Sequence, residues 1–513
     1  MPGGPVAQSG AGLADWTAVA PSPELRRGTW PGWAVGLAIA APFLAAIAAL
    51  RGLTVALPIF HSTDELVYHY PTILRFSHQL PFPDLASYHA AQTPLFHLLM
   101  AYVGKVVGYE LWRLRLVEAL ISYLLALAVY GLLRRRLRLA QPAALALTVL
   151  FVLSPYVYGT SFRVITDNLA TLFIVLALDR FERFRETQSL GPFAAGCAAV
   201  GAAMLTRQSA AFMVGVAALY GLGTPLSRRR RVIAAGTLAA ACAPVAALFL
   251  TWHGLVPPGG NPASCGLCSG AGGAGLEVRT PELALATIGL YGLVLFGPEL
   301  VTLARAAAAE GPRRLLSRPT GSLRAPLLGA FAGVVLLLAF PAHTRADSAG
   351  LIWAVARHVP AVLGTPLVFW ALVPAAGAIL VWRIRAAPRR WIVVVFTACF
   401  LLGTLVIRYP WQKYVDPFAL LIVMMTVRPR ELVSPRALAG AAVLALAFIV
   451  YTADYSSHAN RQLAATRITR ITVEKAPSGG AFSTHIRPAG DYDAAANPSA
   501  TFGQLTTFHH ASM

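Results

Sequence analysis

The stretch ALISYLLALAVYGLLRRRLR, residues 119–138, decides the fold class, because an unbroken apolar run ends in a cluster of arginines. The pattern recurs along the 513-residue chain, in which 57% of the residues are hydrophobic and only 12% are charged. Soluble domains carry about 25% charged residues, whereas apolar runs of about 17–25 residues cross a bilayer as helices. We therefore expect an all-α, polytopic integral membrane protein.

Arginine clusters at alternate loops set the expected topology. With the N-terminus in the cytoplasm, about thirteen transmembrane helices place every such cluster on the cytoplasmic side, as the positive-inside rule requires. This count holds only if the short segment 94–110 lies at the membrane surface or re-enters without crossing. The expected spans are 33–58, 116–133, 142–158, 166–179, 190–206, 208–224, 232–252, 281–304, 325–342, 359–382, 391–407, 414–427 and 436–452.

The same topology divides the chain into three parts. Residues 1–32 form a cytoplasmic N-terminal segment, and residues 33–452 form the transmembrane domain. Within that domain, the first outer loop, 61–115, interleaves histidines, aromatics and prolines, so we expect it to be ordered and catalytic. The polar tail, 453–513, is expected to be poorly ordered on the outer face.

The formal net charge of +20 could indicate nucleic-acid binding. However, the arginines lie in short clusters between apolar runs, so their arrangement indicates membrane topology and no nucleic-acid partner. The histidines of the first loop match no known ligand spacing, so we expect no metal.

The segment STDELVYHYP, residues 62–71, places two adjacent carboxylates at the start of the first outer loop. Ser62 and Glu65 have the spacing of a capping box, so Glu65 has a structural interpretation. Asp64 is a candidate catalytic base. A helix here would bring Glu65 and His69 to one face, and we expect Pro71 to limit its length.

Two later segments place ionisable residues at membrane depth. ITDNLATL carries Asp167 at the outer end of a span, and LTRQSAAFM carries Arg207 and Gln208 between two apolar halves. Such residues are costly in a membrane and usually functional. A purely structural pair of Asp167 and Arg207 is the alternative.

These segments resemble a known family in order and spacing. DELVYHYPTILRF, PFPDLASYHAAQTPLFHLL, ITDNLATL and LTRQSAAFM are similar to the terminal alpha-1,2-glucosyltransferase family of the dolichol pathway, over roughly the first 225 residues. The D-E start of the outer loop also resembles the broader GT-C superfamily of polyprenyl-phosphate-sugar transferases. The chain departs from the family at Gln92-Thr93-Pro94, where the family tends to have a proline pair, and at Ser209-Ala210.

The resemblance implies a membrane glycosyltransferase that moves a glucose-like hexose from a polyprenyl- or dolichyl-phosphate donor to a glycan, lipid or protein acceptor. Such a transfer needs a carboxylate base and cations for the departing phosphate. No cofactor is expected. The candidate catalytic residues are Asp64 and Glu65, and the candidate donor-binding residues are Arg207, Gln208, His69, Asp167, Arg345, Arg408 and Lys413.

Other interpretations stay open. A sibling enzyme could transfer mannose, arabinose or aminoarabinose, and a lipid or solute transporter is the alternative from another class. The high Ala, Arg and Gly content favours a prokaryotic plasma membrane over the endoplasmic reticulum, with the active site on the extracytoplasmic face. In the outer loop 253–280, Cys265 and Cys268 are expected to form a disulfide.

Overall fold

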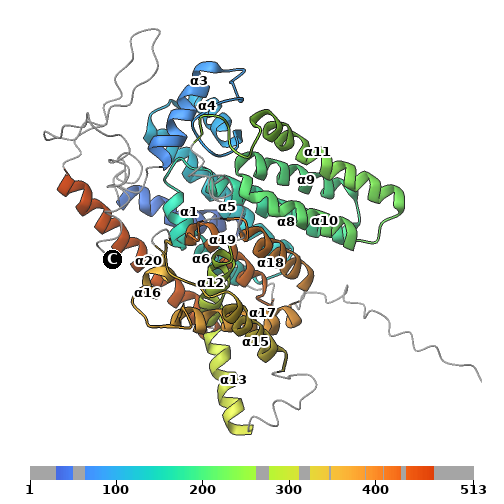
Figure 1. Cartoon of the computed structure of the whole chain (residues 1–513), viewed down its shortest axis with the longest axis vertical. Coiled ribbons are helices and arrows are strands. Elements are labelled where there is room, and N and C mark those ends of the chain that lie inside the picture. The colour runs from blue at the N-terminus through green and yellow to red at the C-terminus, as the bar shows by residue number, and fades with distance from the viewer. Residues whose placement is uncertain are drawn as a thin grey trace, which may run out of the picture.

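The computed structural model describes residues 30–49, 64–260, 277–310, 324–345, 348–387, 389–407, 409–428 and 435–466. Helices dominate this part of the chain (Figure 1). The exception is a two-stranded antiparallel hairpin, β1 (Ala361–Val362) and β2 (Thr365–Pro366). Its turn uses Gly364 at a φ of +77°, a conformation that costs glycine little. The expected all-α class therefore holds apart from this hairpin.

The first half of the chain builds one layer of helices, and the candidate site lies between this layer and helices of the second half. It begins with α1 (Gly32–Ala49), the π-helix η2 (Asp64–His69) and α3 (Tyr70–Gln79). Then follow α4 (Leu95–Val107), α5 (Leu111–Arg135), α6 (Gln141–Leu153), α7 (Pro155–Thr160), α8 (Asp167–Thr187), α9 (Leu190–Thr206), the 3-10 helix η3 (Gln208–Ala211), α10 (Phe212–Gly223) and α11 (Arg228–Trp252).

The second half packs against this layer. Its helices are α12 (Arg279–Leu295), α13 (Gly297–Glu310), α15 (Arg324–Ala339), α16 (Leu351–Ala356), α17 (Leu367–Ala386), α18 (Arg390–Thr404), α19 (Gln412–Met425) and α20 (Pro435–Thr466).

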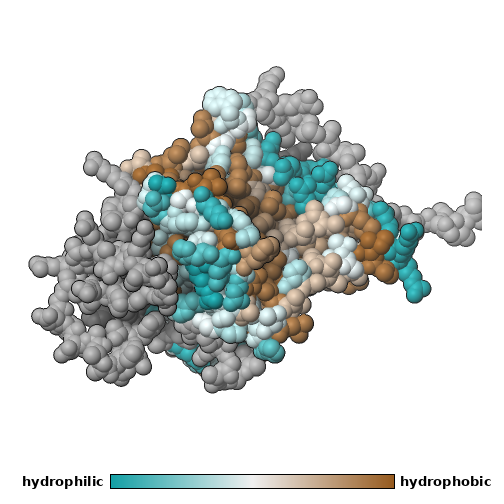
Figure 2. Space-filling view, turned by 90° about the horizontal axis from the view of Figure 1, so that it is seen from above, coloured by the Kyte–Doolittle hydropathy of each residue, from teal (hydrophilic) through white to brown (hydrophobic). Residues whose placement is uncertain are grey.

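Among the described residues, four helices are long and apolar enough to cross a membrane: Gly32–Ala49, Leu111–Arg135, Arg228–Trp252 and Leu367–Arg385. Seven further apolar helices are shorter, at 10–17 residues. Seen from above, apolar surface covers much of the described face and is interrupted by hydrophilic patches (Figure 2). The chain is an integral membrane protein, and the count of about thirteen spans stays a prediction.

Several expected spans have different boundaries in the structure. The expected span 142–158 is two helices, α6 and α7, because the chain turns at Ser154 and Pro155 begins the next helix. The expected span 281–304 divides between α12 and α13 at Phe296. The expected span 359–382 begins later, at Leu367, because the β-hairpin occupies its first residues.

The first outer loop is ordered over the residues that the structure describes. Helices α3 and α4 lie side by side at the top of Figure 1, and α4 also contacts α5 and α9. The expectation that Pro71 limits the surface helix is wrong. Pro71 lies just after the point where the π-helix η2 passes directly into α3, and the helix continues beyond it to Gln79.

Candidate functional site

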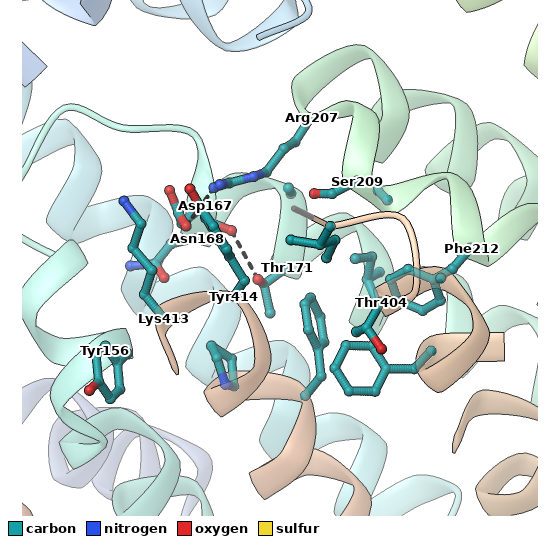
Figure 3. Close-up of a pocket in the computed structure, with 18 residues that line it drawn as sticks. Tyr156, Asp167, Asn168, Thr171, Arg207, Ser209, Phe212, Thr404, Lys413 and Tyr414 are labelled. Atoms are coloured by element: carbon teal, nitrogen blue, oxygen red, sulfur yellow. Dashed lines mark hydrogen bonds and ion pairs between the residues drawn. The ribbon is translucent and has the colours of Figure 1, made fainter. Parts of the chain in front are cut away.

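The break between α9 and α10 carries Arg207. Its backbone is extended, so the helix ends at Thr206 and restarts as η3 at Gln208. The guanidinium Nη1 lies 2.5 Å from Oδ1 of Asp167, at the start of α8. A carboxylate in the first turn of a helix is favoured by the helix dipole. The structure thus joins the two ionisable residues that the sequence placed at membrane depth, and Figure 3 shows Arg207 reaching toward Asp167.

A second ion pair lies beside the first. Lys413, in the first turn of α19, places its Nζ 3.1 Å from Oδ2 of Asp64 on η2. The Asp64 side chain is 46% exposed, so this pair stays open to solvent. The Lys413 ammonium lowers the pKa of Asp64 from 3.8 to about 2, against the opposing effect of burial and with smaller contributions from His69 and Arg207. In this state Asp64 is ionised and paired.

Aromatic rings support both cations. The Arg207 guanidinium lies 5.0 Å from the ring centre of Tyr414, and the Lys413 ammonium lies 4.8 Å from that of Trp411 and 5.2 Å from that of Tyr414. Such contacts hold a cation while leaving its hydrogen-bond donors available. The segment 409–414 therefore positions two positive charges together.

These charges lie where two cavities meet. Asp167, Arg207, Lys413 and Tyr414 line both of them. The polar cavity is also lined by Asp64, His69, Gln92, Ile165, Thr166, Tyr409 and Trp411. The second cavity, drawn in Figure 3, continues between α8, α10, α18 and α19 and is lined at its far side by Ile174, Phe212, Phe400, Ile407 and Phe418. The site is therefore charged at its centre and apolar on one side.

Glu65 has a different environment from its neighbour Asp64. It is fully buried, and both carboxylate oxygens accept hydrogen bonds from the Arg115 guanidinium on α5. The backbone N–H of Val164 also donates to Glu65 at 2.7 Å. Ser62, the expected capping partner, lies outside the described residues. Glu65 therefore ties η2 to α5 and to the turn before α8.

His69 is the third η2 residue at the site. It is buried and lines the polar cavity, and its Nδ1 lies 2.9 Å from Nε2 of His97 on α4. Burial lowers the pKa of His69 from 6.5 to about 4, despite the neighbouring Asp64 carboxylate. Glu65 and His69 are both buried, which agrees with the predicted shared face, but they contact different elements: Arg115 on α5 for Glu65 and His97 on α4 for His69.

Some predicted site residues are elsewhere. The Gln208 side chain lines neither cavity and donates to the backbone carbonyls of Ala91 and Leu255. Arg345 is exposed and also lines neither cavity. Arg408, Cys265 and Cys268 lie outside the described residues, so the expected disulfide stays a prediction.

Sequence reasoning missed Gln92, His97, Trp411 and Tyr414 as site residues. The alternation of aromatics and cations in RYPWQKYVDP was a usable signal for the last two. Gln92 stood out only as part of the departure from the resembled family at Gln92-Thr93-Pro94. Among the residues that the structure describes, no three His, Cys, Asp or Glu side chains are grouped as metal ligands.

Comparisons with known proteins bear on this site. A family model described as dolichyl-phosphate-mannose-protein mannosyltransferase matches residues 91–252, less than half of the chain. No curated protein matches the chain. The matched segment contains Asp167 and Arg207 and excludes Asp64 and Lys413.

Two solved structures of ArnT from Cupriavidus metallidurans are loosely similar. The apo form is 14% identical, with 77% of each chain covered and a TM-score of 0.35. The form bound to undecaprenyl phosphate is 15% identical, with 86% of this chain and 81% of that chain covered and a TM-score of 0.38. At these scores the likeness carries no weight for the site. The family model supports the broader resemblance to the GT-C superfamily, while the glucosyltransferase family stays a prediction.

Proposed function

We propose that the chain is an integral membrane glycosyltransferase that moves a hexose from a polyprenyl-phosphate-linked donor to an acceptor hydroxyl, with Asp64 as the base. One observation carries the proposal: two cations and two carboxylates meet where a polar cavity joins an apolar one. The description of the matching family model, a dolichyl-phosphate-mannose-dependent transfer, belongs to the same chemical class.

The two cavities suit the two halves of such a donor. Its phosphate would lie between Arg207 and Lys413, whose donors are held by cation–π contacts with Tyr414. The isoprenoid chain would follow the apolar wall of Phe212, Phe400 and Phe418. The sugar would then occupy the polar cavity beside Asp64.

The Asp64–Lys413 pair explains how a weakly basic carboxylate could act as a general base. With a pKa of about 2, Asp64 is a poor proton acceptor while Lys413 is its partner. A phosphate between Lys413 and Arg207 would compete for the ammonium and bring negative charge near Asp64. Both effects raise the pKa of Asp64, so donor binding would activate the base.

The chemical step balances without a cofactor. Asp64 takes the proton of the acceptor hydroxyl as that oxygen forms a bond to the anomeric carbon. The bond between that carbon and the phosphate oxygen breaks, and its electron pair leaves with the polyprenyl phosphate. Arg207 and Lys413 stabilise the charge that develops on this oxygen. A single displacement of this kind inverts the anomeric centre.

The other carboxylates have supporting roles in this proposal. Asp167 orients Arg207 through their ion pair. Glu65 holds η2 in place through Arg115 and Val164, so we assign it a positioning role, although the sequence made it a second candidate base.

Our proposals for the transferred sugar and for the cellular compartment depend on the sequence. The DELVYHYP resemblance favours glucose, whereas the family model is named for mannose, which keeps the sibling mannosyl- or arabinosyl-type transferase as the alternative. We place the reaction on the extracytoplasmic face of a prokaryotic plasma membrane, or in the endoplasmic reticulum of a eukaryote. The acceptor is a glycan, lipid or protein hydroxyl.

The test is to supply purified full-length protein in lipid nanodiscs with labelled polyprenyl-phosphate glucose, mannose or arabinose and acceptor extracts. We expect polyprenyl-phosphate release from one donor. Asp64→Asn should lower turnover about 10²–10⁴-fold while donor binding persists, because a general base contributes that much. Asp84→Asn is the matched control, since Asp84 lies in the same loop in an exposed pair with Arg75.

Two outcomes would contradict the proposal at different levels. Unchanged turnover in Asp64→Asn would show that Asp64 is not the base, while the proposed glycosyl transfer would stand. An absence of release from every donor by the wild-type protein would reject the glycosyltransferase and favour a transporter.

A further inference from the structure

Gln92 is a polar residue of the polar cavity that the mechanism above does not use. It lies in the segment between α3 and α4 and lines this cavity together with Asp64 and His69. Its side-chain oxygen Oε1 is buried and has no hydrogen-bond partner among the described residues. Leaving a buried amide oxygen without a donor is costly, and because the Gln92 side chain lines the cavity, a turn of that side chain would let a bound ligand supply the donor.

The backbone around Gln92 is held firmly. The Tyr88 hydroxyl donates to the Gln92 carbonyl at 2.7 Å, and the Thr93 hydroxyl donates to the Met204 carbonyl at 2.6 Å. The Gln208 amide donates to the Ala91 carbonyl at 2.7 Å. These three bonds hold the backbone of residues 91–93 near the end of α9 and the start of η3, so the backbone that carries the Gln92 side chain is fixed beside Arg207.

His69 presents a second polar group to the same cavity, and His97 determines its orientation. The 2.9 Å bond uses Nδ1 of His69, so Nε2 is the ring nitrogen left for the cavity. The His69 and His97 rings are only 20° from parallel. The rings of Phe76, Tyr88 and Phe96 surround His97, which is fully buried. His97 is thus a positioning residue for His69.

We propose that Gln92 and His69 form a subsite that recognises the hydroxyl groups of the transferred sugar. The inference rests on the proposed function, in which the phosphate occupies Arg207 and Lys413 and the anomeric carbon faces Asp64. The remaining polar wall of the cavity then faces the sugar ring. A neutral amide oxygen and one imidazole nitrogen suit uncharged hydroxyls, which both donate and accept hydrogen bonds. Gln92 therefore determines which hexose is accepted.

The test measures kcat/KM for wild type and Gln92→Leu with the preferred polyprenyl-phosphate hexose and its 2-, 3-, 4- and 6-deoxy analogues. In the wild type, kcat/KM should be about tenfold to a hundredfold lower for one particular deoxy donor than for the parent sugar, because that donor leaves the buried amide unpaired. With the parent sugar, kcat/KM of Gln92→Leu should be lower than that of the wild type by a similar factor. With that one deoxy donor, kcat/KM of the variant should be no lower than its own value with the parent sugar. For each of the other deoxy donors, the ratio of its kcat/KM to that of the parent sugar should be the same in both proteins.

Two controls keep the outcomes distinct. Gln79→Leu, in the same loop but outside the cavity, should keep the wild-type pattern. If Gln92→Leu folds poorly, the same measurements are made with Gln92→Met, whose side chain is unbranched. An equal loss for all five donors in the Gln92 variant would overturn the subsite while the proposed function stands. If the wild type transfers no sugar, the proposed function fails first and the subsite falls with it.

Discussion

The two ends of α8 contain the same kinds of charged residue in different surroundings. Asp167 begins the helix, and its ion pair with Arg207 lines both cavities. Roughly 22 Å further along the helix, Glu182 is fully buried and accepts hydrogen bonds from the Tyr220 hydroxyl and the guanidiniums of Arg185 and Arg389.

The neighbours of Glu182 extend this second cluster. Asp179 pairs with Arg136, and Glu186 pairs with both Arg136 and Arg389. Here each carboxylate has an arginine partner, and Arg136 and Arg389 each pair with two carboxylates of α8. The cluster at the end of α8 thus stabilises the fold, whereas the pair at its start faces space that a ligand could fill.

Glu182→Ala should produce the largest effect, and it should be on stability. It leaves a buried tyrosine hydroxyl and two arginines short of a partner, so the free energy of unfolding should fall by about 3–5 kcal/mol. Thermal unfolding in detergent measures this change. Turnover per folded molecule should stay at the wild-type level, and a selective loss of turnover would place this end of α8 in the site.

Arg207→Ala should act on the reaction. Removing a preorganised charge at the leaving group should lower kcat/KM by about 10²–10³-fold, with a smaller change in melting temperature. Arg389→Ala is the matched control, because it removes an arginine from the other end and should lower the melting temperature without changing the chemistry. If Arg207→Ala chiefly unfolds the protein, the pair with Asp167 is structural and the contrast between the two ends disappears.

Lys413→Met should move the pH dependence. The ammonium lowers the pKa of Asp64 to about 2, so its removal raises that pKa toward and above 3.8. A base is active above its pKa, so the acid limb of kcat/KM should move to higher pH in the variant by about one unit or more. In the wild type, the acid limb of kcat should lie at higher pH than that of kcat/KM, because bound phosphate weakens the Asp64–Lys413 pair. If the acid limbs of kcat and kcat/KM coincide in the wild type, donor binding does not raise the pKa of Asp64.

Arg185→Ala should have the smallest effect. Arg185 is 36% exposed and pairs with Glu182 at 3.2 Å, three residues away on the same helix. The Arg185 end of this pair is partly exposed, and Glu182 keeps its Tyr220 and Arg389 partners without it, so we expect a loss of about 0–1 kcal/mol, as for partly solvated ion pairs. A larger loss of unfolding free energy would show that the cluster depends on its outer members as well as on Arg389.

Much of the helical framework could be predicted from local pattern. The helix break at Arg207 and the start of α8 beside Asp167 agree with the expected spans within one residue. The division at Ser154–Pro155 was missed, although a proline that begins a helix is a recognised signal. Hydropathy averages over such a turn, so two short helices were interpreted as one span.

The candidate site was predictable only in part. Asp64, His69, Asp167, Arg207 and Lys413 come together as cavity-lining residues. Lys413 could not be distinguished from Arg345 by residue type, because both are cations of expected outer loops. Their difference depends on helix packing, which brings the first turn of α19 to η2 across 349 positions of sequence.

The sequence by itself determined the membrane class, the helical framework and a short set of ionisable candidates, because apolar length and charge are local properties of the chain. The sequence favoured Asp64 over Glu65 through a capping box, but only the tertiary structure gave the two carboxylates their surroundings. The two are adjacent, yet one faces a cavity beside Lys413 and the other is buried against Arg115. Neighbouring side chains on a helical segment point in different directions, so their chemistry depends on what packs against each face.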